Sequence, residues 1–437
     1  MPDPTTPLAP ALPADPYAAL RVPDFRRLLS ARVLFTTATQ IQGVVVSWQI
    51  FRLTGDPLAL GLIGLAEAIP SIGVSLYAGH VADAVRRKRI IVPAVAVLFL
   101  CALTLFWLAR PAQAGVLSGG RLYVGWLHAT LVWPLYLVIF VSGIARGFLG
   151  PALFSFMPQL LPAGRALLPN AITWNSSTWQ AASVLGPAAG GLLFARLGIG
   201  VAYGVDVVME GLALLLFISI ASRPLPPPVG ERLPLAESLT SGFRFIFSNQ
   251  IVLAALSLDM FAVLFGGAVA LLPIFAADIL RAGPDALGYL RAAPSVGSVA
   301  MAVLLTFVPL RRGAGRKLLW AVAGFGLATI AFALSRNLYL SLFLLFLTGV
   351  FDSVSVIVRS TLIHTYTPEH MKGRVSAVNN IFIGSSNEIG AFESGAAAKL
   401  LGTVPSVVFG GLMTLAVVGF TAWRADKLRG LEMGAKK

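Results

Sequence analysis

The chain has 437 residues, of which 57% are hydrophobic and only 12% charged, and its mean hydropathy is +0.82. A soluble domain of this length does not need so apolar a composition to build its core, so most of the chain is predicted to lie in lipid. The formal net charge of +14 would suit a nucleic-acid-binding protein, but the basic residues stand in short clusters between apolar runs. Such clusters are typical of loops that face anionic lipid, so we expect a lipid bilayer and no nucleic acid as partner.

Cysteine and histidine usage excludes several classes of site. Cys101 is the only cysteine and lies inside an apolar run, so the sequence offers neither a disulfide framework nor a cysteine-based metal site. The four histidines fall at predicted helix ends or in loops. The sequence also lacks a Walker A loop and an H-E-x-x-H pattern. We therefore expect no bound metal, no cofactor and no enzyme activity.

Apolar segments suited to membrane crossing follow one another along the whole chain. A crossing needs roughly 20 apolar residues, so twelve crossings and their loops use up a chain of this size. The expected segments are 28–53, 58–79, 90–109, 128–154, 167–196, 200–221, 251–277, 286–310, 318–334, 338–362, 374–402 and 404–424. The predicted fold is an all-α polytopic membrane protein of twelve transmembrane helices in two six-helix bundles.

A proline-rich stretch divides the chain into two halves, because the prolines between Pro224 and Pro234 cannot continue a helix. Within this stretch, Ser238–Phe247 alternates polar and apolar residues at helical spacing, which predicts a short interfacial helix. The expected parts are an N-terminal tail at 1–27, a bundle at 28–221, a linker at 222–250, a bundle at 251–424 and a C-terminal tail at 425–437.

The basic residues predict the orientation of the chain in its membrane. One set of alternate loops holds most of the lysine and arginine residues, among them the cluster Arg86–Arg89. Because short cytoplasmic loops carry the excess of positive charge, this set is assigned to the cytoplasm. We expect a multi-pass protein of the bacterial inner membrane with both termini cytoplasmic.

Weak internal repeats support two related halves, because each match joins one span to the span six positions later. Pro70–Gly73 resembles Pro294–Gly297, and Ser142–Arg146 resembles Thr348–Asp352. In the fifth and eleventh spans a constant offset aligns Asn175 with Asn379, Gly186 with Gly390, and Gly191 with Gly395.

The loop after the second span carries a recognisable pattern. Gly79–Arg89 reads G-H-V-A-D-A-V-R-R-K-R, which resembles the G-x-x-x-D-x-x-[GR]-R-K-R signature of the major facilitator superfamily. A generic basic loop would explain the arginines but not the glycine and the aspartate at this spacing. The resemblance implies a loop that clasps the two halves on the cytoplasmic side, through Gly79, Asp83, Arg87 and Lys88.

Further segments resemble motifs of the same superfamily. Val184–Gly191 resembles its G-P-x-x-G-G motif, through Gly186, Pro187, Gly190 and Gly191, and that motif is associated with antiporters and exporters. A small-residue packing face is the alternative interpretation. Gly373–Asn379 and Ser386–Gly395 resemble the branch of bacterial exporters that includes the enterobactin exporter. That branch covers siderophores, drugs and uncharacterised solutes.

Polar side chains recur on single faces of several spans, and such faces must point into helix contacts or a water-filled cavity. Arg146 also resembles the R-x-x-x-G signature of the fourth helix, and a membrane-embedded arginine usually faces a polar cavity or an acidic partner. The residues expected to line a cavity and contact a substrate are Thr36, Gln40, Arg146, Asn175, Ser177, Gln180, Asn379 and Asn387.

Acidic residues inside the apolar spans are candidates for proton coupling. A carboxyl group in a low-dielectric cavity favours its neutral form and a nearby cation restores the charged form, so a helix movement can switch proton affinity. The candidates are Asp259, Glu388 and Glu393, with Glu67 in reserve; the alternative is that they are structural acids. Asp352 and Arg359 are expected to form an ion pair, and Asp206, Glu210 and Lys399 to lie near interfaces.

The combined expectation is a monomeric secondary active transporter that exports an amphipathic small molecule in exchange for protons by alternating access. A lipid or lysolipid flippase, or an importer of the same fold, is the alternative within transport. A membrane sensor or a transporter-like scaffold without turnover is the alternative from another class.

Overall fold

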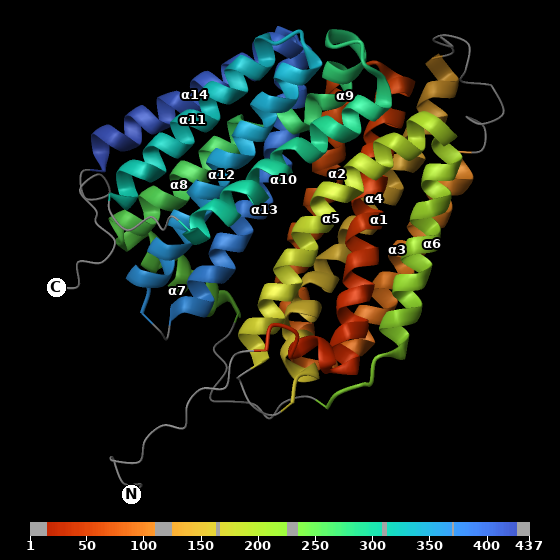
Figure 1. The fold of residues 1–437 in the computed structure, drawn as a ribbon, viewed down its shortest axis with the longest axis vertical. Coiled ribbons are helices and arrows are strands. Elements are labelled where there is room, and N and C mark those ends of the chain that lie inside the picture. The colour runs from red at the N-terminus through yellow and green to blue at the C-terminus, as the bar shows by residue number, and fades with distance from the viewer. Residues whose placement is uncertain are drawn as a thin grey trace, which may run out of the picture.

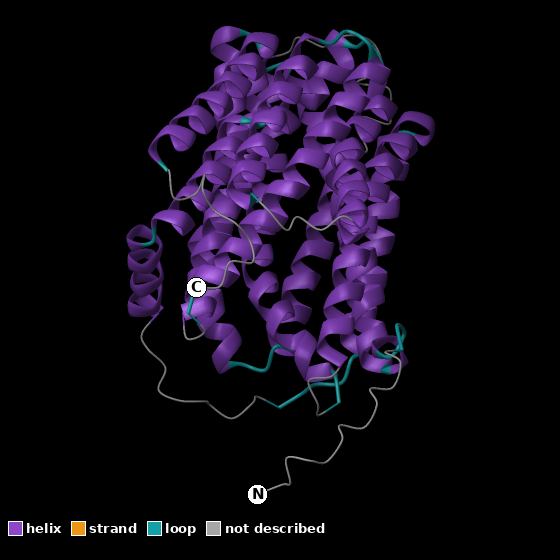
Figure 2. Cartoon of the chain, turned by 60° about the vertical axis from the view of Figure 1, so that its left-hand side comes forward, coloured by secondary structure: helices purple, strands orange, loops and turns teal. Residues whose placement is uncertain are grey.

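A computed structural model describes residues 15–109, 125–162, 167–224, 235–307, 313–368 and 371–425. Within these residues the chain forms helices and no strands, and the long helices run roughly parallel (Figure 2). The expectation of an all-α fold is therefore confirmed. Residues 1–14, the loop around Gly119 and residues 426–437 lie outside the described residues, so the expected tails are described only at residues 15–27 and 425.

The first half contains six long helices, preceded by the short 3-10 helix η1 and with a second 3-10 turn, η3, directly after α4. They begin and end within a few residues of the predicted segments, because Gly, Pro and charged residues bound the apolar runs. Their bounds are η1 Ala19–Arg21, α1 Pro23–Thr54, α2 Pro57–Ala84, α3 Lys88–Leu108, α4 Gly125–Phe156, η3 Met157–Leu160, α5 Leu168–Leu197 and α6 Ile199–Ser219.

The second half begins with the linker helix α7, which covers the predicted interfacial segment. The long helices after it follow the predicted order. The bounds are α7 Leu235–Ser248, α8 Gln250–Phe265, η5 Ala268–Leu271, α9 Leu272–Ile274, η6 Phe275–Ile279, α10 Gly283–Phe307, α11 Ala314–Leu334, α12 Leu338–Tyr366, α13 Lys372–Leu401 and α14 Thr403–Arg424.

The predicted seventh span is not one continuous helix. It stops after Phe265, passes through Gly266 and Gly267, and resumes as the 3-10, α and π turns of η5, α9 and η6. The two glycines are needed here because a Cβ on Gly266 would lie 2.5 Å from a ring atom of Phe325, and a Cβ on Gly267 would lie 2.5 Å from Oγ of Ser394. The irregular backbone lies beside a cavity, where membrane proteins tolerate such breaks.

Nine stretches of the described helices are long and apolar enough to cross a membrane. The long helices α1, α5 and α13 are not among them, because polar side chains recur along each of these three. Large apolar side chains are exposed on the outer helix faces, for example Trp107, Leu215, Leu400 and Phe420. Such surfaces need an apolar solvent, which identifies a multi-pass membrane protein.

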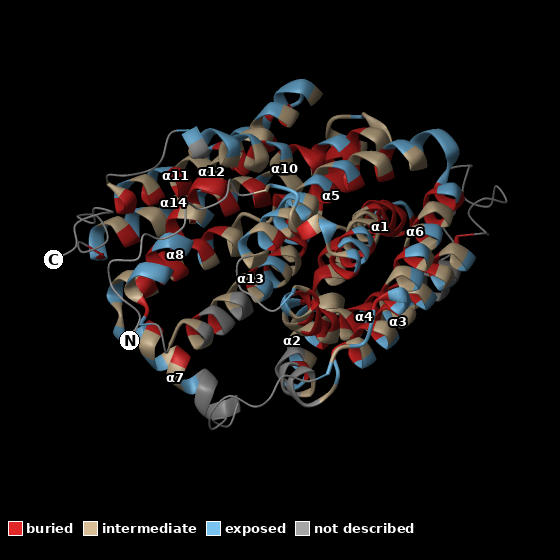
Figure 3. Ribbon diagram, turned by 60° about the horizontal axis from the view of Figure 1, so that its bottom comes forward, coloured by how far each residue is buried: buried red, intermediate tan, exposed pale blue. Residues whose placement is uncertain are grey.

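The helices form two bundles that meet along two lines, α2 beside α13 and α5 beside α10 (Figures 1 and 3). The bundles are close together at the end where α2 and α10 begin, at the top of Figure 1, and spread apart towards the end where α7 lies. We refer to these as the closed end and the α7 end.

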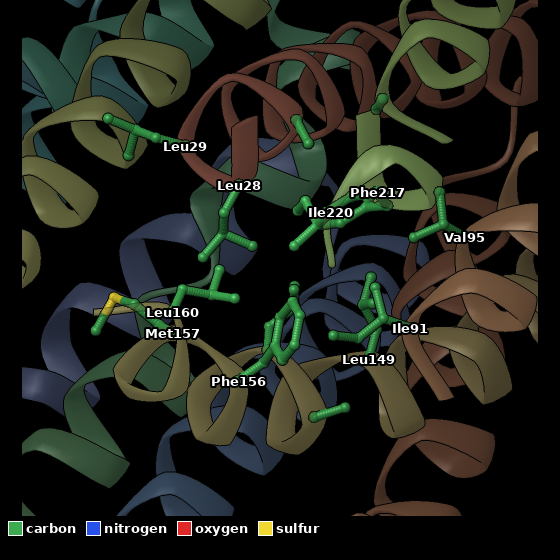
Figure 4. Packing of buried hydrophobic residues seen from close by; sticks show 14 of the residues in the cluster. Leu28, Leu29, Ile91, Val95, Leu149, Phe156, Met157, Leu160, Phe217 and Ile220 are labelled. Carbon is green, nitrogen blue, oxygen red and sulfur yellow. The ribbon is translucent and has the colours of Figure 1, made fainter. Parts of the chain in front are cut away.

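Each bundle has its own apolar core. At the α7 end of the first bundle, Leu28 of α1, Ile91 of α3, Phe156 of α4 and Phe217 of α6 are all nearly inaccessible and pack together (Figure 4). Figure 3 shows the same pattern for whole helices, with buried faces turned towards neighbouring helices. The second bundle has a separate core that includes Leu258 of α8, Leu318 of α11 and Val358 of α12.

A third apolar cluster joins the bundles at the closed end. Val44, Trp48 and Leu60 of the first bundle pack with Leu271 and Phe332 of the second. This apolar layer and the two bundle cores position the side chains that face the space between the halves.

Candidate functional site: a central cavity with opposed charges

A cavity of about 1080 Å³ lies between the two bundles. Its wall comes from α1, α2, α3, α4 and α5 of the first half and from α8, η5, α10, α11, α12 and α13 of the second. This volume is at the upper end of what small-molecule sites need. The wall mixes polar groups with aromatic surface from Trp179, Phe325 and Phe332, which suits an amphipathic molecule.

A chain of polar contacts crosses the first bundle at the cavity wall. Arg146 of α4 forms an ion pair with Glu67 of α2, and its Nη2 donates to Oε1 of Gln42 on α1 at 3.4 Å. Nε2 of Gln42 donates in turn to Oδ2 of Asp206 on α6 at 3.1 Å. Arg146 therefore has an acidic partner and faces a cavity, as embedded arginines usually do.

Asp206 and Glu210 do not lie near an interface, so that expectation is wrong. Both carboxyl groups are fully buried in the first bundle, and one oxygen of each has no hydrogen-bond partner in the described structure. They occupy the middle of α6, and their four-residue spacing puts them on one face. Arg146 interacts electrostatically with Asp206, Glu210 and Glu388 as well as with its ion-pair partner Glu67.

Glu388 reaches this cluster from the other half of the molecule. It lies in α13, and its Oε2 would be 3.3 Å from a Cβ placed on Gly64 of α2, so it lies directly against the opposite bundle. Its carboxyl group interacts electrostatically with Glu67 and Arg146. Glu388 is thus the charged group that joins the second half to the arginine cluster of the first.

The candidate cavity residues separate into two groups. Gln40, Asn175, Gln180 and Asn387 line the cavity together with Arg146. Thr36, Ser177 and Asn379 do not line it; Ser177 is exposed, and Oδ1 of Asn379 is buried without a hydrogen-bond partner in the described structure.

The proton-coupling candidates separate in the same way. Glu67 and Glu388 line the cavity, whereas Asp259 and Glu393 do not. Asp259 of α8 forms a buried ion pair with Arg359 of α12, so the expected pairing of Asp352 with Arg359 is wrong. The seven-residue spacing put Asp352 and Arg359 on one face of α12, but α8 supplies the partner of Arg359, and Asp352 lines the cavity instead.

The glycine motif of α5 packs against two different helices. A Cβ on Gly186 would lie 2.6 Å from Cβ of Gln40, and one on Gly190 would lie 3.0 Å from Cα of Ile41, both on α1. A Cβ on Gly191 would lie 2.7 Å from Cα of Gly288 on α10, in the other half. The backbone oxygen of Pro187 is part of the same crossing, because a Cβ on Gly288 would lie 2.6 Å from it.

The second half repeats this arrangement. A Cβ on Gly390 would lie 2.7 Å from the backbone oxygen of Leu264 on α8, and one on Gly395 would lie 2.7 Å from Cα of Gly61 on α2. We call the two contacts between halves, Gly191–Gly288 and Gly395–Gly61, the glycine seam. Beside it Nζ of Lys399 lies 2.5 Å from Oδ2 of Asp56, which also caps α2. The seam closes one end of the cavity.

The basic loop lies at the other end. Nζ of Lys88 donates to the backbone oxygens of Ile218 and Ile220, at 2.6 Å each, and so caps the end of α6 in its own half. Arg87 is buried. The surroundings of Gly79 and of the Asp83 side chain lie outside what the structure describes, so the predicted clasp rests on the sequence pattern.

The fold and the cavity define a membrane transporter for small molecules: two helical bundles, with a polar, charged cavity between them. The family model of the Major Facilitator Superfamily matches residues 28–391, and the chain belongs to this family. In the described residues there is also no group of three or more His, Cys, Asp or Glu side chains that could hold a metal ion.

Curated relatives include proteins named as exporters. The chain is 28% identical over 404 residues to the protein named enterobactin exporter EntS of Shigella boydii serotype 18, and the match covers 90% of each chain. This similarity agrees with the exporter branch expected from the sequence and with a position in the inner membrane.

Solved structures share the fold. A bacterial homologue of the iron transporter ferroportin in an inward-facing state superposes with a TM-score of 0.70 at 17% identity, covering 95% of this chain and all of that one. Another structure, titled as such a homologue in an outward-facing state, gives a TM-score of 0.61 at 19% identity, covering 93% of this chain and 99% of that one.

Proposed function

We propose that this protein exports an amphipathic small molecule in exchange for protons by alternating access. The carrying observation is that Glu388 of the second half lies against Gly64 of α2, three residues before the Glu67 that pairs with Arg146, at the wall of a cavity large enough for a substrate. The named exporters among its relatives support the direction of transport.

The glycine seam and the layer around Trp48 support alternating access, because they close one end of the cavity with contacts between rigid bundles. A rocking movement that opens this end must separate α13 from α2 and α10 from α5. The present conformation then corresponds to an inward-facing one, in keeping with the higher TM-score to the inward-facing neighbour. We propose that the α7 end and both termini are cytoplasmic and that the monomer is the working unit; a reporter fused at Lys437 tests the orientation.

The same movement supplies a coupling step. With the closed end shut, Glu388 interacts both with Glu67, which together with burial favours its neutral form, and with Arg146, which favours its charged form. Separation of α13 from α2 removes Glu388 from Arg146, and an unpaired carboxylate in an apolar surrounding takes up a proton. A proton is thus taken from the outside in the outward-facing state and released inside when the halves close again. The membrane potential favours this proton entry by roughly 2.3 kcal/mol per charge per 100 mV.

The test compares E388Q with E393Q, a matched control on the same helix whose side chain does not line the cavity. The transported compound is first identified by comparing the metabolites that a deletion strain and its parent secrete. Both variants are then reconstituted in liposomes and tested with this compound. E388Q is expected to retain exchange of labelled for unlabelled compound but to lose accumulation driven by a pH gradient, whereas E393Q keeps both. Gradient-driven accumulation by E388Q would place coupling elsewhere.

A further inference from the structure

Arg291 is a cation in the cavity wall that has no partner within the described structure. It lies in α10, makes no hydrogen bond or ion pair there, and its Nε is buried. Its Nη1 would lie 3.2 Å from a Cβ placed on Gly43 of α1, so the guanidinium extends from the second half to the first. An embedded arginine without an acidic partner is costly, which calls for an explanation.

The internal repeats show what its counterpart does. Glu67 lies three residues before Pro70 in the second span, and Arg291 lies three residues before the equivalent Pro294 in the eighth. Arg146 lies three residues after Gly143 in the fourth span, and Asp352 lies three residues after the equivalent Gly349 in the tenth. The helices also cross alike, because a Cβ on Gly143 would meet Pro70 and one on Gly349 would meet the equivalent Pro294.

The two halves therefore place opposite charges at equivalent positions. In the first half Glu67 and Arg146 form an ion pair. In the second half Arg291 and Asp352 both line the cavity, and no ion pair joins them in the described structure. One half holds a satisfied pair, and the other presents its charges to the cavity.

Of the pair Arg291 and Asp352 in the second half, Arg291 is the one that needs a ligand of opposite charge. An arginine stays protonated under all physiological conditions, whereas the carboxyl groups of Asp352 and Glu388 can lose their charge by binding a proton. The charge of Arg291 can be balanced only by an anion. Its planar guanidinium matches a carboxylate with two parallel hydrogen bonds, and the aromatic surface of Trp179, Phe325 and Phe332 offers contact for an apolar body.

We propose that Arg291 binds an anionic oxygen group of the transported molecule, a carboxylate or an acidic phenolate, so that the substrate class is amphipathic organic anions. This inference rests on the proposed transport function, since it assigns the ligand of the same cavity. The competing possibility, a cationic substrate held by Asp352 and Glu388, is an outcome of the test below.

The test measures binding of three naphthalene probes to the purified full-length protein in detergent: 2-naphthoate, the isosteric neutral 2-naphthamide and the cationic 2-naphthylmethylammonium. The wild type is expected to bind naphthoate at least about tenfold more tightly than naphthamide, as a charge-assisted bidentate contact allows. R291Q should bind the acid and the amide equally, and R291K should keep part of the preference. E393Q, which removes a carboxyl group that does not line the cavity, should keep all of it.

Equal binding of acid and amide by the wild type, tighter binding of the ammonium probe, or no measurable naphthoate binding at millimolar concentration would overturn the proposal. So would a preference for the acid that survives in R291Q. Thermal unfolding of each variant verifies that it is folded. If R291Q is unstable, the preference of R291K for the acid over the amide provides the test instead. Because binding is measured without a gradient, carboxylate binding at Arg291 in a protein that transports nothing would refute only the exporter function.

Discussion

A single methyl group added to the glycine seam tests whether the seam holds the closed end shut. In G395A the new Cβ would lie 2.7 Å from Cα of Gly61 and 2.8 Å from the backbone oxygen of Pro57, both backbone atoms of α2. Carbon atoms prefer separations of about 3.5–4.0 Å, so the halves must move apart by roughly 1 Å. The strain applies only while the seam is closed, so the substitution shifts the equilibrium towards the opposite conformation.

The size of the shift follows from the cost of overpacking. An extra methylene in a well-packed contact costs about 1–3 kcal/mol, which corresponds to a population change of roughly 5-fold to 150-fold. G191A should act similarly, because its Cβ would lie 2.7 Å from Cα of Gly288. The matched control is G384A, on the same helix as Gly395, where a Cβ would meet nothing within 4 Å.

Cysteine labelling in whole cells reads this equilibrium directly. Cys101 is the only cysteine, so C101S gives a cysteine-free background. A cysteine introduced by S47C lies on the cavity wall, next to the apolar layer of Val44 and Trp48, and is buried in the present conformation. A membrane-impermeant maleimide added outside should label S47C faster in G395A and G191A than in G384A. Equal rates in all three, with equal protein abundance, would show that the seam does not control access.

Two further ion pairs give predictions of different size. D56N keeps a side chain that can cap α2 but loses the ion pair with Lys399. Because this pair is partly exposed, its loss should cost only about 0.2–1 kcal/mol, so D56N should raise external labelling of S47C less than about fivefold. A larger increase in labelling than G395A causes would contradict the expectation that the glycine contact matters more than the ion pair. D259N leaves Arg359 buried without its partner, so it should lower stability by about 3–5 kcal/mol, seen as a lower melting temperature in detergent, and D259N/R359Q should recover part of the loss. A stable D259N protein that has lost only pH-gradient-driven transport would instead restore Asp259 as a coupling site.

The helices could be predicted because their signals are local. Apolar runs ended by Gly, Pro or charged residues located every long helix, and the turn glycines Gly198 and Gly402 follow α5 and α13 with φ of 86° and 93°, a backbone region that favours glycine. The break at Gly266–Gly267 was missed because its cause is tertiary. Phe325, Ser394 and the backbone of α13 fill the space that side chains would occupy.

The partners of charged residues could not be predicted, because spacing within one helix says nothing about its neighbours. Arg359 had a plausible partner on its own helix, yet its carboxylate comes from α8. Asp206 and Glu210 were misplaced although a signal existed. Each lies at least seven residues from either end of α6, which at 1.5 Å per residue is about 10 Å from an interface, too far for these short side chains.

Close helix packing accounts for the glycines of the α5 motif, and this packing indicates how the motif contributes to function. Gly186 lies against α1 of its own half and Gly191 against α10 of the other, and Gly390 and Gly395 of α13 do the same with α8 and α2. Each of these two helices therefore belongs to a rigid bundle along one part and to a separable contact along another. The backbone-to-backbone contacts between these glycines bring the halves together without burying charged side chains between them, and the Lys399–Asp56 pair beside the seam is partly exposed. Such a glycine contact can close tightly and still open at a modest cost in free energy. A contact made of ion pairs would cost more to open, because its charged side chains would have to be solvated again each time the halves separate. Under the proposed alternating access, the motif therefore serves the conformational change, and the direction of transport follows from which molecules and protons bind to the charged groups of the cavity.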